Sequence, residues 1–222
     1  MKLNVMGRDR TLDFKPSSLI IAGFTGKDRA STERHIKELA DIGVPVPERV
    51  PAFFVLNPDL VSTFDRITVS SRESSGEVEP VLINVKGELF IGVGSDHTAR
   101  DVEKESIAES KSSCQKPISC DVMEYGSLKS VWDSIEIRSW VKTGSGMVKY
   151  QEGSVSQIMD IPDLLKELKS TVDVSLENSV LFLGTLPLLA GNFVYGDEFE
   201  VELRVPSTGA VLHHSYTVKI GD

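Results

Sequence analysis

Short runs of apolar residues recur along the whole chain and predict β-strands. The runs cover residues 11–22, 53–56, 66–69, 79–85, 88–93, 134–141, 179–183 and 198–205. The first run ends at the turn signals Gly23 and Gly26. The chain is therefore predicted to be mostly β.

Three segments interrupt the strand pattern and predict helices. In residues 31–43, Ile36 and Leu39 recur at helical spacing between capping residues and a glycine that ends the helix. Apolar residues return at three- and four-residue spacing in 154–171, and residues 98–110 are also predicted to be helical.

Prolines separate the first predicted helix from the strands that follow. Pro45, Pro47 and Pro51 fix their own backbones and bias the preceding residues toward extended structure. Because no long linker follows, residues 1–222 are predicted to form a single domain of the α+β class, rich in β-structure. The pattern alone leaves barrel and sandwich open.

The charge of the chain limits its partners. With 24 Lys and Arg against 33 Asp and Glu, the formal net charge is −9, which disfavours nucleic acid and anionic lipid as partners. No apolar run approaches the roughly 20 residues that cross a bilayer, and the start of the chain shows no signal-peptide core, so we expect a cytoplasmic protein. Cys114 and Cys120 are too few for a disulfide framework and are expected to be reduced thiols.

Paired carboxylates are the first candidate for chemistry. On a strand, Glu77 and Glu79 point to the same face, and Asp96 follows in a glycine-rich turn. Two like charges so close must share a proton or a cation, and an all-oxygen ligand set suits Mg²⁺ or Mn²⁺. The alternative is a solvated face of the strand.

A histidine and a glutamate on the first predicted helix form the second candidate. His35 and Glu38 lie three residues apart and therefore on one helix face, where the carboxylate can orient the imidazole as a general base. The alternative is a pair of solvated neighbours.

Two lysines form the third candidate. Lys111 and Lys116 lie in a polar stretch and can supply positive charge to an anionic substrate or to a developing oxyanion. The alternative is a surface loop. His97, His213 and His214 are assigned structural roles, and His97 is expected to face away from the carboxylate that precedes it. Three turns complete the pattern, at residues 151–154 (a predicted helix entry), 184–187 and 195–198.

The order of these elements resembles the fumarylacetoacetate hydrolase superfamily. The matching elements are His35-x-x-Glu38, Phe53-Phe54, Glu77-x-Glu79, Gly94 to Val102, Lys111-Ser112, Gln151-Glu152-Gly153-Ser154, Gly184-Thr185-x-Pro187 and Gly196-Asp197-x-x-x-Val201-Glu202. The run from Asp96 to Asp101 is the most specific of them. The resemblance spans about residues 20–219 and is strongest to a small, functionally uncharacterised branch of the superfamily.

The resemblance implies a distorted, mixed β-roll or barrel with flanking helices, usually assembled as a homodimer. Residues 28–43 are implied to form a lid helix over the substrate. The implied metal ligands are Glu77, Glu79 and Asp96, which would bind one Mg²⁺ or Mn²⁺. The implied catalytic residues are His35, Glu38 and Lys111, and the implied substrate-binding residues are Gln151, Thr185, Gly184 and Lys116, with Lys116 a rival to Lys111 for the substrate's charge.

The implied activity is hydrolysis or decarboxylation at C–C bonds of small 2-oxo or β-diketo acids, such as acylpyruvates or oxaloacetate. A metal-chelated enolate would be the intermediate, with the histidine–glutamate dyad as the base. A lyase, hydratase or isomerase on the same metal site is one alternative, and a non-catalytic ligand-binding protein is another. The short connection between residues 79 and 96, Gly94-Ser95 before the aspartate and the inserted Leu186 predict an altered substrate pocket.

Overall fold

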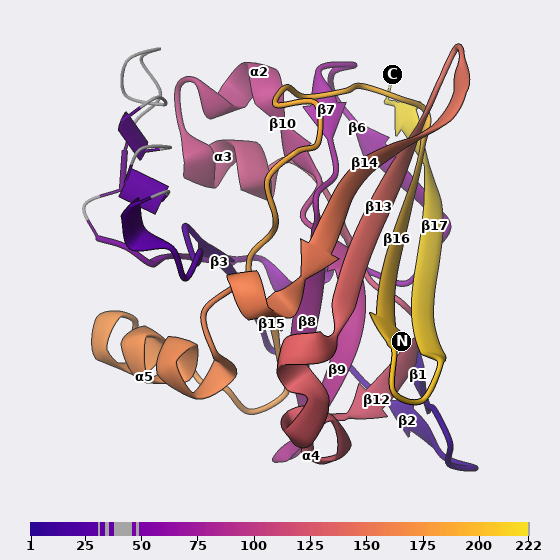
Figure 1. The fold of residues 1–222 in the computed structure, drawn as a ribbon. Coiled ribbons are helices and arrows are strands. Elements are labelled where there is room, and N and C mark those ends of the chain that lie inside the picture. The colour runs from indigo at the N-terminus through magenta and orange to yellow at the C-terminus, as the bar shows by residue number, and fades with distance from the viewer. Residues whose placement is uncertain (31, 34–35, 38–45, 48, 222) are drawn as a thin grey trace.

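Two β-sheets build the core of the protein, in a computed structural model that describes residues 1–30, 32–33, 36–37, 46–47 and 49–221. The first sheet contains, in spatial order, β2 (Thr11–Asp13), β1 (Lys2–Val5), β12 (Asp121–Glu124), β9 (Glu88–Ser95), β8 (Val78–Val85), β15 (Ser179–Phe182), β3 (Ser18–Gly23) and β4 (Ala52–Leu56). The second contains β14 (Gly146–Ser154), β13 (Glu136–Thr143), β16 (Glu198–Val205), β17 (Ala210–Ile220) and β6 (Arg66–Val69). Figure 1 shows the long strands of the second sheet side by side in front of β8 and β9.

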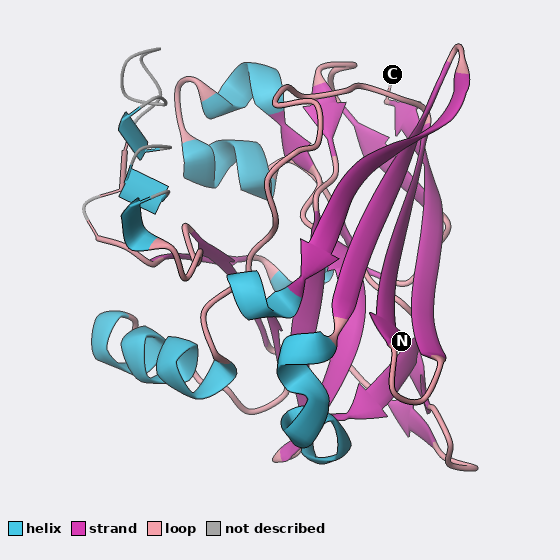
Figure 2. Cartoon of the chain, viewed as in Figure 1, coloured by secondary structure: helices cyan, strands magenta, loops and turns pink. Residues whose placement is uncertain are grey.

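Short elements connect and flank these sheets. Two small ladders pair β10 (Thr98–Ala99) with β7 (Ser74–Ser75) and β11 (Lys116–Pro117) with β5 (Val61–Ser62). In the described part of the chain, the helices with complete bounds are α2 (Arg100–Glu103), α3 (Ile107–Ser112), α4 (Tyr125–Leu128) and α5 (Ile161–Thr171), and residues 29–30, 32–33 and 36–37 are also helical. The 3₁₀ turns are η1 (Pro58–Leu60), η2 (Lys129–Ser134) and η3 (Val155–Gln157). Figure 2 shows α2, α3 and α5 on the side of the molecule away from β17.

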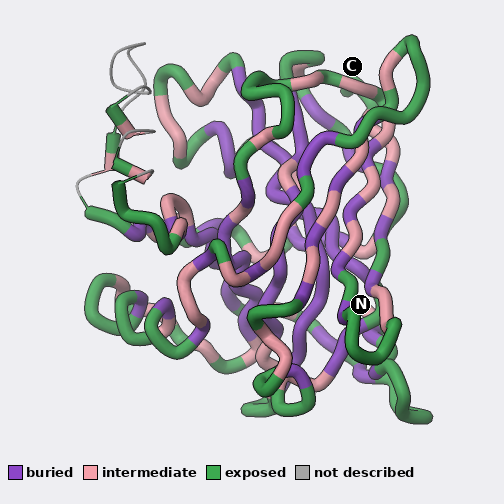
Figure 3. The backbone as a smooth tube through the Cα atoms, viewed as in Figure 1, coloured by how far each residue is buried: buried purple, intermediate pink, exposed green. Residues whose placement is uncertain are grey.

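The central strands of the first sheet are buried on both faces. Ile20 and Leu181 belong to a core shared with β13, β16 and α5, whereas their neighbours Leu19 and Val180 belong to a second core on the opposite face. Successive side chains of a strand point to opposite faces, so a strand covered on both sides reads as a continuous apolar run. Figure 3 shows the buried residues concentrated along these strands.

Most predicted strands are confirmed, and the α+β, β-rich class is confirmed with them. The predicted strands 66–69 and 198–205 coincide with β6 and β16. The run 11–22 is instead two strands, β2 and β3. Residues 151–154 belong to β14, and Ser154 at its end caps the short 3₁₀ helix η3, so the predicted helix entry is confirmed only at Ser154.

Two predicted helices differ from the structure. Residues 98–110 divide into β10, α2 and α3, because Ser106 is extended and its side chain caps a new helix by accepting from the N–H of Glu109 at 3.2 Å. The helix predicted from residue 154 begins only at Ile161, where Pro162 is tolerated in the first turn. The predicted lid helix at 28–43 lies largely outside the described residues.

Candidate functional site

A β-hairpin brings the three predicted metal ligands together. The turn between β8 and β9 places Lys86 and Gly87 at positive φ, and its register pairs Glu79 with Gly94. Extending this register sets Glu77 opposite Asp96, and the N–H of Asp96 donates to the carbonyl oxygen of Glu77 at 3.0 Å. Glu79 and Asp96 are buried and the Glu77 side chain is 15% exposed, so the alternative of a solvated strand face is wrong.

Both candidate lysines contact the same carboxylate. The ammonium of Lys111, at the end of α3, donates to Oδ2 of Asp96. The ammonium of Lys116, on β11, lies 2.8 Å from Oδ1 of Asp96 and donates to the carbonyl oxygen of His97. Lys111 is 8% exposed and Lys116 fully buried, so the alternative of a surface loop is wrong for both.

Opposite electrostatic environments act on the two buried carboxylates. Burial raises the pKa of Glu79, and the charge of Asp96 raises it further, against the opposing charge of Lys111. Burial alone would raise the pKa of Asp96 too, but the charges of Lys111 and Lys116 outweigh it and hold that pKa below its usual range. The two lysines therefore favour the ionised form of Asp96, whereas burial favours the protonated form of Glu79.

Arg100 holds the third carboxylate and is a residue whose role the sequence analysis missed. Its Nη2 lies 2.8 Å from Oε2 of Glu77, and its Nε donates to Ser75 at 2.8 Å. The guanidinium also pairs with Glu103 at 2.9 Å, and the ring centre of Phe193 lies 3.9 Å from it. Arg100 belongs to the sequence motif from Asp96 to Asp101, but only its contact with Glu77 in the structure shows that it holds this carboxylate.

The predicted substrate-binding residues of β14 and the 184–187 turn brace the strand that carries the glutamates. The side-chain oxygen of Gln151 accepts from the N–H of Val78 at 2.8 Å, and its NH₂ group donates to Thr185 Oγ1 at 2.8 Å and to the Leu186 carbonyl at 2.7 Å. Thr185 donates to the Val78 carbonyl, and the N–H of Gly184 donates to Oε2 of Glu79 at 2.7 Å. The structure thus brings these residues to the carboxylates, and their role in substrate binding remains a prediction.

His97 lies in a buried aromatic cluster with Tyr216 and Phe199. Its Nδ1 lies 3.0 Å from the hydroxyl of Tyr216, which in turn lies 2.7 Å from Ser95 Oγ, and its ring meets that of Phe199 edge-on. Burial lowers the pKa of His97 to about 3, and the charge of Lys116 acts in the same direction.

The buried histidine predicts a pH dependence of stability. Between pH 6.5 and 3 the unfolded chain protonates His97 and the folded protein does not, so stability falls as the pH decreases. In urea unfolding with EDTA, the advantage of wild type over His97→Gln is expected to shrink by about 2 kcal/mol from pH 7 to pH 5. His213→Gln, at an exposed histidine that lies 3.7 Å from Glu200, is the control for the loss of a histidine side chain outside the core. A His97→Gln difference that stays constant across this range would contradict the prediction.

The predicted general-base pair cannot be placed. His35 and Glu38 lie outside the described residues, so the dyad and the lid remain predictions from the sequence. Thr32, which is described, donates through its hydroxyl to the carbonyl of Asp28 at 3.1 Å.

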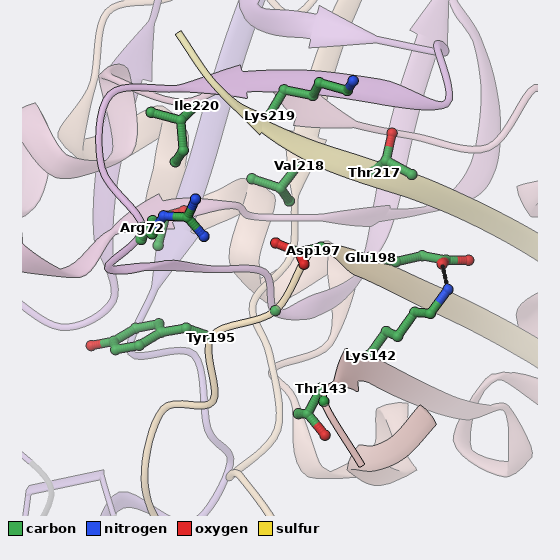
Figure 4. Close-up of a pocket in the computed structure, with 13 residues that line it drawn as sticks. Arg72, Lys142, Thr143, Tyr195, Asp197, Glu198, Thr217, Val218, Lys219 and Ile220 are labelled. Carbon is green, nitrogen blue, oxygen red and sulfur yellow. Dashed lines mark hydrogen bonds and ion pairs between the residues drawn. The ribbon is translucent and has the colours of Figure 1, made fainter. Parts of the chain in front are cut away.

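A cavity of about 890 Å³ lies apart from the carboxylates (Figure 4). In the described part of the chain it is lined by Arg72, Ser74, Lys142, Thr143, Gly144, Tyr195, Gly196, Asp197, Glu198, Thr217, Val218, Lys219 and Ile220. None of the predicted catalytic, metal or substrate residues is among them, and Lys142 is already paired with Glu198 at 2.9 Å. The buried cluster of charged side chains around Asp96 therefore identifies the candidate site, and the size of this cavity does not.

The carboxylates suit a hard divalent cation by chemistry. All their donor atoms are oxygens, and Oδ1 of Asp96 is a buried acceptor without a hydrogen bond in the described residues, although Lys116 forms an ion pair with it. As arranged, no three Asp, Glu, His or Cys side chains of the described residues converge in a way that would hold a metal ion. No described helix is long and apolar enough to cross a membrane.

Comparison with known proteins places the chain in a family. A sequence model described as "Protein of unknown function (DUF2848)" matches residues 22–216. The chain belongs to this family. Among curated protein sequences, none matches this DUF2848 member.

Solved structures with the same fold include enzymes of oxo-acid chemistry. A 2-keto-3-deoxy-D-arabinonate dehydratase complexed with magnesium and 2,5-dioxopentanoate is 16% identical, with a TM-score of 0.67 over 93% of the DUF2848 chain and 74% of the dehydratase. A 5-carboxymethyl-2-hydroxymuconate delta-isomerase from Mycobacterium smegmatis is 16% identical, with a TM-score of 0.65 over 97% and 87%. A maleylpyruvate hydrolase from Sphingobium sp. SYK-6, in complex with manganese(II) and pyruvate, is 14% identical, with a TM-score of 0.64 over 94% and 72%. The predicted fold, a distorted β-roll with flanking helices of the fumarylacetoacetate hydrolase type, is confirmed.

Proposed function

We propose that this protein is a divalent-metal-dependent enzyme that cleaves C–C bonds of small 2-oxo or β-diketo acids, by hydrolysis or decarboxylation. The observation that carries the proposal is a largely buried cluster in which Asp96 meets Lys111 and Lys116, Glu77 meets Arg100, and Glu79 is held by the N–H of Gly184. Buried charges are costly, and a cluster of this kind is more typical of a reaction site than of a structural core. Neighbours with the same fold bind magnesium or manganese and oxo acids, which supports the same chemistry here.

In the proposed site, Glu77, Glu79 and Asp96 hold Mg²⁺ or Mn²⁺. Such a cation supplies Lewis-acid polarisation of the substrate's oxygens. The backbone N–H of Gly184 and the guanidinium of Arg100 hold Glu79 and Glu77 in place. Each fixed hydrogen bond reduces the reorganisation needed when the cation and the substrate bind.

The lysines and the predicted histidine–glutamate dyad have separate roles, the first in balancing charge and the second in proton transfer. Lys111, with Lys116 as its rival, faces the anionic end of the oxo acid and balances negative charge that develops during the reaction. His35, oriented by Glu38, takes a proton from the attacking water. Gln151, Gly184 and Thr185 frame the 2-oxo acid end. We further propose one domain over residues 1–222 with 28–43 as a lid, a homodimer, and a cytoplasmic location.

A lyase, hydratase or isomerase reaction on the same residues is the second candidate. Its support is that the structural neighbours include a dehydratase and an isomerase. Product analysis separates the two, because hydrolysis yields two organic acids and decarboxylation yields one acid and CO₂, whereas hydration, dehydration or isomerisation leaves the carbon skeleton intact.

Thermal unfolding with EDTA, with Mg²⁺ or Mn²⁺, and with metal plus oxalate tests the proposal without a guess at the substrate. A ligand of the native state raises the midpoint by mass action, and oxalate mimics the enolate of pyruvate. We expect a rise with metal that grows by several degrees with oxalate at about 100 times its Kd, followed by turnover of acylpyruvates or oxaloacetate. Unchanged midpoints in every condition would favour a non-catalytic ligand-binding protein instead.

A further inference from the structure

Lys111 and Lys116 bind the same carboxylate but are anchored very differently. Lys116 is fully buried on β11, where it pairs with Val61 of β5, and it has a second attachment at the carbonyl of His97. The Lys111 side chain is 10% exposed and projects from α3, a helix of six residues. Among the described residues, Asp96 is its only hydrogen-bond partner. Lys116 is therefore fixed by the fold, whereas Lys111 can leave by turning its own side chain.

Lys111 sits where a cation bound by the three carboxylates would be stabilised. Its ammonium contacts Asp96, and the charges of Asp96, Glu77 and Glu79 together outweigh burial and raise the pKa of this lysine. Lys111 and Lys116 are both on Asp96, and Arg100 is shared between Glu77 and Glu103. A divalent ion that binds Asp96 would meet strong repulsion from the ammonium of Lys111 held against the same oxygens.

We propose that Lys111 occupies the divalent-cation position of the carboxylate cluster in the metal-free protein and is displaced from Asp96 when the metal binds. This inference rests on the proposed metal-dependent function. The displaced ammonium is then free to meet the anionic group of the substrate, so the cation binds first and the acid second. Lys116 stays on Asp96 throughout and keeps that carboxylate oriented. Lys116 therefore orients Asp96, whereas Lys111 contacts the substrate, and the two lysines are not alternatives for one role.

Titration with Mn²⁺, followed by the electron paramagnetic resonance signal of the free ion, tests the displacement at a fixed pH. Lys111→Met keeps the length of the side chain and removes its charge. It is expected to bind Mn²⁺ roughly tenfold or more tightly than wild type. Lys104→Met, which removes the charge of an exposed lysine one helix away, is the matched control and should bind like wild type. Equal or weaker Mn²⁺ binding by Lys111→Met, with binding retained in wild type, overturns the displacement and leaves the metal site intact. No Mn²⁺ binding by either protein overturns the metal site as well.

A measurement on the unaltered protein decides the matter if Lys111→Met does not fold. An amine-reactive reagent followed by mass spectrometry reports the reactivity of each lysine with and without Mg²⁺. Labelling of Lys111 is expected to rise several-fold with Mg²⁺, while Lys116 stays protected and Lys104 stays reactive, because only Lys111 gives up its ion pair. Unchanged labelling of Lys111 in a protein that Mg²⁺ stabilises overturns the displacement.

Discussion

Asp96→Asn is expected to lower the free energy of unfolding of the metal-free protein by about 3–5 kcal/mol. The fully buried carboxylate is the shared counter-ion of Lys111 and Lys116, and its loss leaves two buried ammonium groups without it. Removing one partner of a buried ion pair is more destabilising than removing the whole pair, because the remaining charge stays desolvated. Urea unfolding with EDTA measures the change.

The same variant separates stability from metal binding. Asp96→Asn is also expected to abolish the rise in unfolding midpoint with Mg²⁺ or Mn²⁺ and any metal-dependent turnover, since it removes one of three proposed ligands. Asp121→Asn, at an exposed aspartate that accepts a hydrogen bond from Asn4, is the matched control and should change neither quantity appreciably. Retained metal-dependent stabilisation in Asp96→Asn would exclude Asp96 as a ligand.

The carboxylate cluster could be predicted because its geometry is almost entirely local. Strand alternation sets the faces of Glu77 and Glu79, and the tight turn at Lys86 and Gly87 fixes the register that brings Asp96 opposite. A hairpin needs no information from distant residues, so the residue pattern could indicate that the three carboxylates are neighbours, although it left a solvated strand face open as the alternative.

The partners of that cluster depend on contacts far apart in the sequence. The 98–110 segment is not one helix because Thr98 and Ala99 pair with Ser75 and Ser74 of β7. Gln151 was expected at a helix entry because the chain around it does not show that β14 pairs with β13 and meets Val78, 73 residues away. Local propensity cannot supply such pairings.

The burial of the lysines illustrates the same limit. A polar stretch containing Lys111 and Lys116 has the composition of a surface loop. It becomes interior only because Asp96 provides charge compensation 15 residues before the first lysine. The role of Arg100 could not be predicted for the same reason, because it depends on the ion pair with Glu77 that only the fold creates.

Gly184→Ala is expected to lower the free energy of unfolding by about 3 kcal/mol or more. Gly184 has φ +106°, a conformation that alanine rarely adopts, and an added Cβ would lie 1.8 Å from Thr25 Oγ1. That hydroxyl is buried and donates to the Leu183 carbonyl at 2.8 Å, so it cannot withdraw without losing its hydrogen bond. The backbone would have to move instead, and with it the N–H that holds Glu79.

Gly146→Ala is the matched control, because it tests the backbone strain without the collision. Gly146 has φ +111°, close to that of Gly184, and nothing within 4 Å of an added Cβ, so its replacement is expected to cost only about 1–2 kcal/mol. Urea unfolding of both variants gives the difference, which measures the close approach of the 184–187 turn to Thr25. If the two substitutions were equally destabilising, this turn would have room to adjust, and Gly184 would be required for its backbone conformation alone. A larger loss in Gly184→Ala, together with a weaker effect of Mn²⁺ on its unfolding midpoint, would connect this glycine directly to the position of Glu79.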